Sequence, residues 1–398
     1  MMGEKIQLIE KDKCAGCMAC VNACPKSVIK MEPDDEGFLY PIISYDLCIA
    51  CGQCKCVCPA YSTAKKDEGL PDTYAAINLN EDILKKSTSG GVFSALADII
   101  REKNGYVVGC VFNDDMEAVH KVIPPHETYD ALRGSKYVQS NIGGTYQEVK
   151  KLLNEEKYVL FTGAACQIDG LYSYLGGEYD KLYTCDIICH GVSSPGLWQM
   201  HKNYLEGNNR FLINYSFRDK SSEGWGLYYC YYYSYKRFPK LKLHKTGTCL
   251  EDEYFLSFLT GKNYRVCCYS CKYASLNRVA DFTLGDFWGV EKYLPDIEAK
   301  AGVSALLINT EKGKKIKAHL DKKMKLIPVV SDWIVAGNKN LHGPTIRPQV
   351  RDTYYELINK VGYKKIQKQY KHTKQYLRAK IMALIPLCLK NFLRKVKQ

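Results

Sequence analysis

The sequence predicts an α+β multidomain protein that consists of a cysteine-rich N-terminal module, a mixed α/β domain and a basic helical tail. Three observations predict it: a cysteine run that occurs twice before residue 62, an alternation of strand-like and helix-like segments after residue 74, and positive charge concentrated near the C-terminal end. The chain has 398 residues, 46% of them hydrophobic, so it can bury two or three cores. The expected units are residues 1–62, a linker at 63–73, residues 74–345 and a tail at 350–398.

The N-terminal module contains the spacing C-x2-C-x2-C-x3-C-P twice, 34 residues apart. Bacterial ferredoxins bind [4Fe–4S] clusters with this run, and its fourth cysteine binds the neighbouring cluster. We therefore expect a bacterial-ferredoxin-like module with two [4Fe–4S] clusters and short strands at Val28–Met31 and Phe38–Ile43. Two zinc sites are the alternative, but the doubled, proline-closed arrangement favours iron. The expected ligands are Cys14, Cys17, Cys20 and Cys58 for one cluster, and Cys48, Cys51, Cys54 and Cys24 for the other.

The cysteine content also bears on the cell compartment. The chain has 19 cysteines, which would suit a secreted disulfide scaffold. However, the start Met-Met-Gly-Glu-Lys carries no apolar leader, and no run of about 18 apolar residues suggests a membrane span. We therefore expect a cytoplasmic protein whose cysteines bind metal.

The region after residue 74 alternates between strand-like and helix-like segments, a pattern typical of a mixed α/β domain. Leu227–Tyr235 holds six tyrosines and predicts a strand in a more antiparallel region, and Glu251–Leu259 is expected to be helical. The other expected strands are Tyr74–Asn78, Tyr106–Phe112, Tyr158–Thr162 and Leu182–Ile188, and the other expected helices are Val92–Ile100 and Thr145–Leu153.

Positive charge is concentrated in the tail. The net charge is +13, and residues 364–398 hold 11 Lys and Arg and no Asp or Glu, so the rest of the chain is nearly neutral. A nucleic-acid partner is therefore not expected, because it would need a broad basic face. The tail predicts a basic amphipathic helix interrupted at Pro386. Peripheral contact with the inner face of a membrane, an acidic partner, or simple capping of the domain are the interpretations open for it.

A second group of cysteines lies further along the chain. Cys166 and Cys189 each follow a predicted strand, where loop residues meet at the edge of a sheet. Cys268 and Cys271 form a C-x2-C pair that is typical of zinc or iron–sulfur sites. Ordinary buried thiols are the alternative for all four, and Cys267 leaves the register of the pair open by one residue.

Several stretches together resemble the coenzyme F420 hydrogenase/dehydrogenase beta-subunit family, over about residues 5–345. They are Ser87-Thr-Ser-Gly-Gly-Val-Phe, Gly134-Ser-Lys-Tyr-Val-Gln-Ser140, Cys189-His-Gly-Val, Phe217-Arg-Asp-Lys220 with Gly224-Trp225, and Gly285-Asp-Phe-Trp-Gly.

The resemblance implies an FAD-binding domain with a third [4Fe–4S] cluster near the flavin. Cys166, Cys189, Cys268 and Cys271 match the cysteine positions of the family. One departure is Gly163-Ala-Ala-Cys166-Gln, where the family usually has Gly-Thr-Pro-Cys-Gln, so the backbone before this cysteine is expected to differ.

The expected flavin site is the segment before the helix at Val92. No G-x-G-x-x-G follows a strand in the chain, which argues against a Rossmann site. Hydroxyls and glycines at a helix start expose backbone N–H groups that suit the FAD pyrophosphate, although a plain helix cap has the same composition. The candidates here are Ser87, Thr88, Ser89, Gly90 and Gly91.

Further candidates lie in other resemblance stretches. Ser135 and Lys136 are candidate cofactor contacts, with the Lys136 cation expected near the flavin, and Asp286 and Trp288 complete this set. His190 follows a proposed ligand, so it is a candidate proton donor or a hydrogen-bond donor to a cluster sulfur. His190 and Lys136 are the expected catalytic residues. Solvated or core side chains are the alternative for each.

The expected function follows from electron counting. Clusters exchange single electrons, whereas organic substrates and deazaflavins exchange two together, and a flavin bridges the two regimes. We expect an iron–sulfur flavoprotein oxidoreductase that passes electrons from a ferredoxin-like donor or coenzyme F420 through [4Fe–4S] clusters to FAD and an unknown small-molecule substrate. The alternative is a non-catalytic relay subunit of a larger redox complex.

Overall fold

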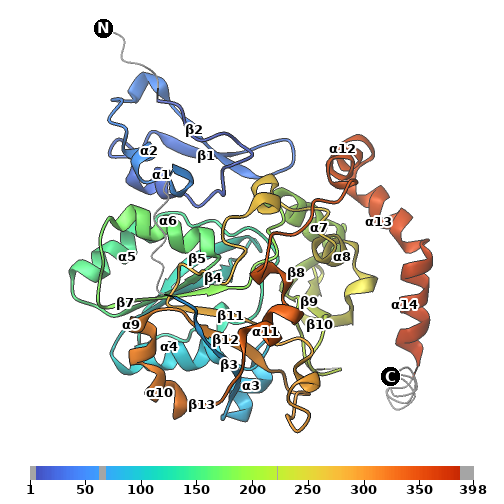
Figure 1. Cartoon of the computed structure of the whole chain (residues 1–398). Coiled ribbons are helices and arrows are strands. Elements are labelled where there is room, and N and C mark those ends of the chain that lie inside the picture. Colours follow the sequence, from blue (N-terminus) through green and yellow to red (C-terminus); the bar gives the residue numbers. More distant parts are fainter. Residues whose placement is uncertain (1–5, 62–68, 222, 386–398) are drawn as a thin grey trace.

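The computed structural model describes residues 6–61, 69–221 and 223–385 (Figure 1). A small N-terminal module sits on a large α/β domain, and an antiparallel sheet with C-terminal helices lies beside that domain. Most of the predicted linker (residues 62–68) and the end of the predicted tail with Pro386 lie outside the described residues.

The N-terminal module is built from two similar halves. An antiparallel hairpin pairs Ile29 with Ile43, and each cysteine run continues into a short helix. Both halves turn through the left-handed region at equivalent positions, Gly16 and Ala50, then Met18 and Gly52. The sequence repeat is therefore also a repeat of backbone geometry. Its elements are α1 (Ala19–Ala23), β1 (Ile29–Pro33), β2 (Leu39–Ile43) and α2 (Gln53–Cys56).

An eight-stranded mixed sheet forms the centre of the α/β domain. Its strands are β3 (Asp72–Asn78), β4 (Tyr106–Phe112), β5 (Ala118–Ile123), β6 (Val159–Gly163), β7 (Leu182–Ile187), β11 (Phe282–Asp286), β12 (Ser304–Ile308) and β13 (Met324–Pro328). Their order is β13-β3-β12-β11-β7-β6-β4-β5, and the four strands β4, β6, β7 and β11 run parallel. The segments that follow these four strands therefore meet at one edge of the sheet.

Helices cover both faces of this sheet. On one face, α4 buries Leu96 and Ile100 together with Leu320 of α10. On the other face, α5 and α6 bury Tyr146 and Leu171 against the strands, and Ala19 of the N-terminal module joins the same core. The module is thus packed onto the α6 side of the domain. The helices are α3 (Glu81–Lys86), α4 (Val92–Glu102), α5 (Thr145–Asn154), α6 (Ala165–Leu175), α9 (Glu311–Lys315), α10 (Lys317–Asp321) and α11 (Ser331–Gly337).

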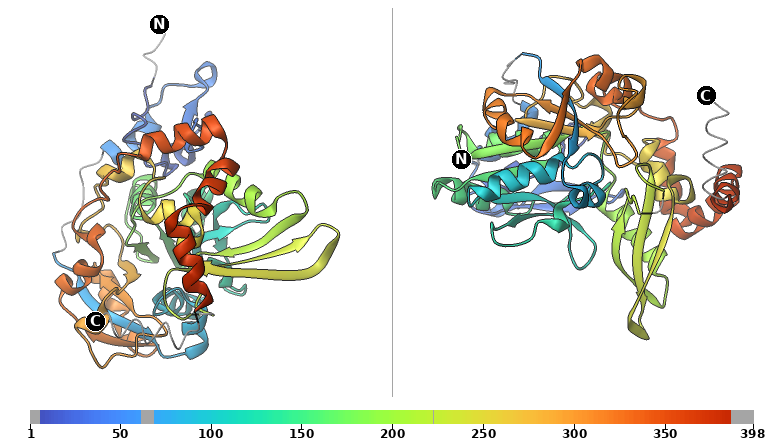
Figure 2. Two further views of the ribbon diagram at one scale, coloured as in Figure 1. Left: turned by 90° about the vertical axis from the view of Figure 1, so that its right-hand side faces the viewer. Right: turned by 90° about the horizontal axis from the view of Figure 1, so that it is seen from below.

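The antiparallel region is rich in aromatic residues. Its three strands, in the order β10-β9-β8, form a long hairpin that projects from the body (Figure 2). Trp198, Tyr215 and Tyr254 pack in its core, to which Ile366 of the C-terminal helices also belongs. The elements are α7 (Pro195–Glu206), β8 (Arg210–Ser216), β9 (Tyr228–Tyr235), β10 (Phe238–Thr248), α8 (Glu253–Leu259), α12 (Arg351–Val361), α13 (Tyr363–Lys371) and α14 (Lys374–Leu384).

The predicted tail is divided between a packed and an exposed part. Helices α12 and α13 belong to the aromatic core, whereas Leu377 and Ile381 of α14 are exposed. Among the described helices, none combines the length and the apolar character that crossing a membrane requires.

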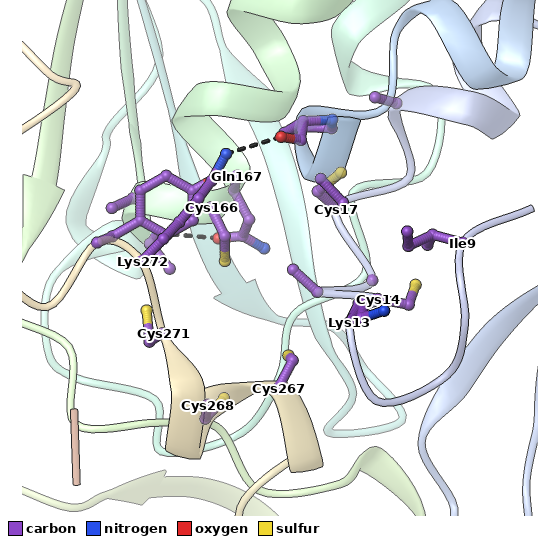
Figure 3. Close-up of a pocket in the computed structure, with 18 of the residues that line it drawn as sticks. Ile9, Lys13, Cys14, Cys17, Cys166, Gln167, Cys267, Cys268, Cys271 and Lys272 are labelled. Atoms are coloured by element: carbon purple, nitrogen blue, oxygen red, sulfur yellow. Dashed lines mark hydrogen bonds between the residues drawn. The ribbon is translucent and has the colours of Figure 1, made fainter. Parts of the chain in front are cut away.

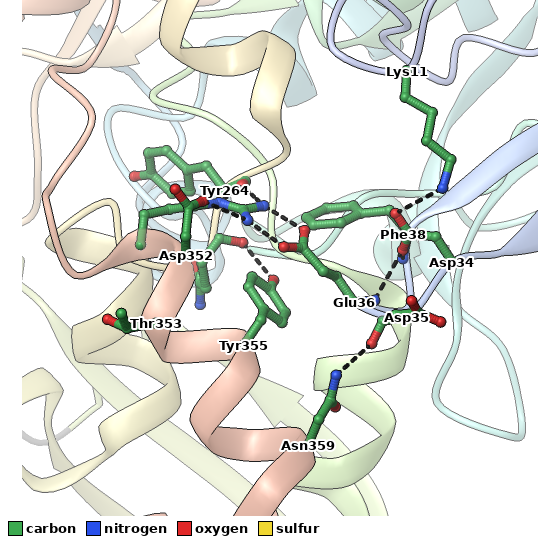
Figure 4. A network of polar contacts seen from close by, with 12 residues as sticks. Lys11, Asp34, Asp35, Glu36, Phe38, Tyr264, Asp352, Thr353, Tyr355 and Asn359 are labelled. Carbon is green, nitrogen blue, oxygen red and sulfur yellow. Dashed lines mark hydrogen bonds and ion pairs between the residues drawn. The ribbon is translucent and has the colours of Figure 1, made fainter.

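A buried ion pair fastens the N-terminal module to helix α12 (Figure 4). The guanidinium of Arg351 is 1% exposed and binds both carboxylate oxygens of Glu36. Asn359 donates to the carbonyl of Asp35 at 3.0 Å, further along the same helix. The hairpin turn of the module is therefore held by the C-terminal region of the chain.

Candidate metal centres

The first set of four cysteines lines a cavity of about 260 Å³ between the N-terminal module and the α/β domain. Burial and the neighbouring thiols of Cys17 and Cys14 raise the pKa of Cys20. Burial also raises the pKa of Cys17, to about 12. The structure thus brings the fourth cysteine of the second run to the first three of the first run, and the set is Cys14, Cys17, Cys20 and Cys58.

The second set lines a smaller cavity at the outer side of the module. Cys54 lines both cavities, so the two sets are adjacent. Cys51 is exposed, which places this set nearest to solvent. The members are Cys24, Cys48, Cys51 and Cys54, the group that the spacing assigns to one cluster. Iron ligation by either set stays a prediction.

The third set lines the large cavity from the opposite side, within the α/β domain (Figure 3). Cys166 is the second residue of α6, and Cys189 follows β7, so the parallel strands place both at the carboxyl edge of the sheet. Cys268 lies in a short 3-10 helix at Val266–Ser270, and Cys271 directly follows it. Burial, followed by the thiols of Cys189 and Cys271, raises the pKa of Cys166.

The register of the C-x2-C pair stays open. Cys267 and Cys268 both line the cavity and interact with each other. Figure 3 draws Cys267 between Cys268 and Cys14, on the side of the N-terminal module. Cys267 is therefore the alternative to Cys268 as a member of the third set.

A close contact between α6 and the first cysteine run positions the two sides of the cavity. A Cβ atom on Gly170 would lie 2.9 Å from Cβ and 3.0 Å from Sγ of Cys17, closer than ordinary side-chain contacts. Only glycine therefore allows α6 to approach this cysteine without displacement. The first and third sets face one cavity because the helix and the cysteine loop are in direct contact.

The residues around the cavities fit iron–sulfur clusters. Each set offers four thiols to one space, and clusters of the [4Fe–4S] type are held by four cysteine thiolates. Within residues 6–61, 69–221 and 223–385, no three His, Cys, Asp or Glu side chains are arranged to hold a single metal ion. The remaining described cysteines do not line either cavity; they are Cys56, Cys110, Cys185, Cys230 and Cys249.

The predicted flavin segment forms the turn before α4, and its polar groups are largely used within the protein. The Ser89 hydroxyl donates to the carbonyl of Val303 at 2.8 Å, and the Gly90 N–H donates to Ser304 Oγ at 2.8 Å. The Ser87 hydroxyl donates to the carbonyl of Ile83, and the helix begins after Gly91. By contrast, the buried hydroxyl of Thr88 has no hydrogen-bond partner. The segment therefore fits a pyrophosphate only in part.

Lys136 is directed toward its own loop. Its ammonium donates to the carbonyls of Ala131 and Arg133, each at 2.8 Å, and burial lowers its pKa to about 8. Its titratable neighbour is the thiol of Cys110, so these contacts do not place it beside Asp286 or Trp288. Ser135, one residue earlier, hydrogen-bonds Tyr137.

Asp286 and Trp288 belong to a network at the end of β11. The Asp286 carboxylate accepts from Arg218 at 2.6 and 3.0 Å and from Trp225 Nε1 at 2.7 Å. The rings of Trp225 and Trp288 stack with centroids 4.8 Å apart. Sequence reasoning missed this stack, although Gly224-Trp225 and the Trp288 stretch were both singled out as resemblance stretches.

His190 joins this network to the third cysteine set. It lines the large cavity and presents exposed surface to it. The surrounding protein atoms lower the pKa of its imidazole by desolvation, while Asp286 raises it to a smaller extent. His190 therefore lies between Cys189, its neighbour in the chain, and the Arg218–Asp286 pair.

Comparison with known proteins supports both parts of the chain. Residues 156–330 match the family formed by the C-terminus of the coenzyme F420 hydrogenase/dehydrogenase beta subunit, and residues 13–62 match the "4Fe-4S dicluster domain". In the N-terminal part, the chain is 34% identical over 68 residues to "Ferredoxin 7Fe" of Hydrogenibacillus schlegelii, covering 17% of this chain and 81% of that protein.

Two archaeal relatives match longer stretches. An uncharacterized protein of Methanocaldococcus jannaschii is 28% identical over 214 residues, which is 45% of this chain and 57% of that protein. One of the subunits of the F(420)H(2) dehydrogenase of Methanosarcina mazei is 23% identical over 172 residues, which is 40% of this chain and 48% of that protein. The chain thus spans about half the length of these two curated relatives.

Among solved structures, a chain of the F420-reducing [NiFe] hydrogenase complex from Methanosarcina barkeri aligns with a TM-score of 0.43 and 15% identity, covering 71% of this chain and 92% of that chain. The two family matches agree with the division into a cysteine-rich module and an α/β domain. The chain belongs to the coenzyme F420 hydrogenase/dehydrogenase beta-subunit family, with a [4Fe–4S] dicluster domain at its N-terminus.

Proposed function

We propose that this protein is an iron–sulfur electron-transfer component that holds three [4Fe–4S] clusters, two in the N-terminal module and one in the α/β domain. The observation that carries the proposal is the single cavity, which the first and third cysteine sets line from opposite sides. When bound, such clusters accept and release single electrons. The third set would consist of Cys166, Cys189, Cys268 and Cys271.

The chain itself would hold, shield and connect these groups. Cys51 of the second set is exposed, whereas the thiols of the third set are enclosed by protein. The second and first sets share Cys54 as a neighbour, and the first and third share the cavity. The three sets therefore form a series from the surface of the module to the interior of the α/β domain.

FAD beyond the third set is the finer part of the proposal. The supporting observation is the buried Thr88 hydroxyl without a partner, in a turn that Lys220 contacts through the carbonyl of Ser89 at 2.8 Å. Lys220 is two residues from Arg218, which binds Asp286, and His190 lies near that pair. Bound FAD would supply the exchange between single electrons and electron pairs. The non-catalytic relay subunit remains the alternative.

The electron partners are proposed from chemistry and from the relatives. One relative is named as part of an F(420)H(2) dehydrogenase, which supports coenzyme F420 as the two-electron partner. A ferredoxin is the one-electron partner that suits the exposed second set. We propose peripheral membrane contact for α14, because Leu377 and Ile381 are exposed among the basic residues of this helix.

Metal and flavin analysis of the anaerobically purified full chain tests the proposal. We expect about twelve irons per chain, since three clusters hold four each, together with one FAD. About eight irons would overturn the third cluster, and twelve irons without flavin would favour the relay alternative. Titration of the reduced protein with F420 and with oxidised ferredoxin then identifies the partner, because only a true partner reoxidises the clusters rapidly.

A further inference from the structure

Arg265 is a fully buried cation beside the large cavity. Its side chain is 0% exposed, and its guanidinium lies 3.9 Å from the ring centroid of Tyr40. Nε donates to the carbonyl of Cys14 at 2.7 Å, and Nη1 donates to the carbonyl of Leu39 at 3.1 Å and to Gln139 Oε1 at 3.0 Å. Nη2 is buried and has no hydrogen-bond partner.

Other buried arginines in the protein have a carboxylate, and Arg265 does not. Arg218 is paired with Asp286, Arg278 with Asp186, and Arg351 with Glu36. In the part of the chain that the structure describes, no acidic side chain forms an ion pair with Arg265. A buried charge is costly unless it is compensated, so Arg265 requires an anionic neighbour of another kind.

The position of Arg265 identifies that neighbour. It binds the backbone of Cys14 in the first set, and it directly precedes the short helix with Cys267 and Cys268. Its charge interacts with the thiols of all three of these cysteines. Arg265 therefore touches both sides of the cavity that the first and third sets share, and its unpartnered Nη2 remains available.

We propose that Arg265 is a positioning residue whose fixed positive charge compensates the thiolate-ligated clusters on both sides of it and holds their reduction potentials high. The inference rests on the proposed cluster ligation. A cluster with four thiolates is anionic and becomes more so when it gains one electron, and a nearby cation in a medium of low dielectric constant favours that gain. Net charge and hydrogen bonds to sulfur are among the factors that set such potentials.

Two substitutions separate the charge of Arg265 from its packing. Arg265→Gln removes the charge, while Arg265→Lys keeps it and loses the fork of hydrogen bonds. The full chain is reduced stepwise with dithionite under anaerobic conditions, and each cluster is followed by electron paramagnetic resonance. We expect Arg265→Gln to shift the potentials of the first and third clusters to more negative values, with the second cluster unchanged. Arg265→Lys should retain most of the wild-type values.

A matched control comes from Arg351, which is also buried between the module and the body but is neutralised by Glu36. Arg351→Gln should leave all three potentials in place. Wild-type potentials in Arg265→Gln with its iron content intact would overturn the inference. Equal shifts in Arg265→Lys and Arg265→Gln would also overturn it, because packing alone would then explain them.

A second variant covers the case in which Arg265→Gln does not load iron. Gln139→Glu places a carboxylate 3.0 Å from Nη1 and neutralises the arginine without removing it. We expect the same negative shift of the first and third potentials, and its absence would contradict the inference. Iron content distinguishes this from failure of the proposed function: about eight irons in the wild type removes the third cluster, whereas about twelve irons with unshifted potentials rejects only the role of Arg265.

Discussion

The two groups of cysteines in this protein are assembled in different ways. The N-terminal ones lie within residues 14–58, and repeated local turns, with positive φ at Gly16 and Gly52, bring them together. The inner ones come from three segments separated by long stretches of chain, which the parallel strands and the 3-10 helix carry to one cavity. Local spacing therefore specifies the first group, whereas the second depends on the complete fold of the α/β domain.

Loss of a ligand should separate the two groups most strongly. We expect Cys189→Ser to lose about four irons and to retain the signals of the N-terminal clusters, and Cys48→Ser to lose about four irons from the module instead. Iron analysis and electron paramagnetic resonance measure both. Cys185→Ser is the matched control, because this buried thiol of β7 lies shortly before Cys189 in the chain and lines neither cavity. Full iron content in Cys189→Ser would remove Cys189 from the third set.

Removal of the ion pair between module and body should have the next largest effect. Glu36→Gln leaves the buried guanidinium of Arg351 without its carboxylate, so we expect a loss of about 3 kcal/mol in the free energy of unfolding. Asp352→Asn is the control, because this exposed carboxylate contacts the same arginine and should contribute less than about 1 kcal/mol. Thermal unfolding compares them, and equal losses would show that Glu36 does not fasten the module.

A methyl group on α6 should disturb the contact between the two groups. Gly170→Ala places a carbon against Cys17, and we expect it to cost about 2 kcal/mol and to broaden the signal of the first cluster only. Gly177→Ala, where a Cβ atom meets nothing within 4 Å, should be close to neutral. An unchanged first-cluster signal in Gly170→Ala would mean that the loop accommodates the methyl group.

The smallest effect is a pH dependence that arises in the C-terminal helices. Burial raises the pKa of Glu253 to about 7, and its carboxylate accepts from Tyr354 and Gln367. Because the folded protein holds this proton more tightly than the unfolded chain, stability falls as pH rises through the range between 4.5 and about 7. Between about pH 6 and pH 8, we expect a loss of roughly 1 kcal/mol that Glu253→Gln abolishes.

Hydrogen exchange of α12 and α13 reports this dependence locally. Exchange should become faster toward pH 8, after correction for intrinsic rates, in the wild type but not in Glu253→Gln. The same pH dependence in both proteins would assign it to another group.

The sequence predicted local elements better than their assembly. The strand at Tyr106–Phe112 has the predicted bounds, and the predicted strand at Leu182–Ile188 ends one residue earlier, because continuous apolar runs are typical of buried strands. The regrouping of Cys24 and Cys58 also followed from spacing alone. By contrast, the shared cavity, the Trp225–Trp288 stack and the uncompensated Arg265 depend on contacts between distant segments, which no local pattern encodes.

The flavin expectation illustrates the same limit. Composition at Ser87–Gly91 suits a helix start with free N–H groups, but β12 and the residue before it supply the partners of Ser89 and Gly90 from 214 positions away. Lys136 likewise finds its acceptors in its own loop. Hydrogen-bond satisfaction by distant residues cannot be inferred from the segment itself.

The magnetic interaction between reduced clusters tests the central claim most directly, because it requires the first and third cysteine sets to hold clusters across one cavity. We predict that the fully reduced wild type gives a spectrum broadened by spin coupling beyond that of the two N-terminal clusters, and that Cys189→Ser reduces the spectrum to the pattern of those two alone. A wild-type spectrum identical to that of Cys189→Ser would contradict the account.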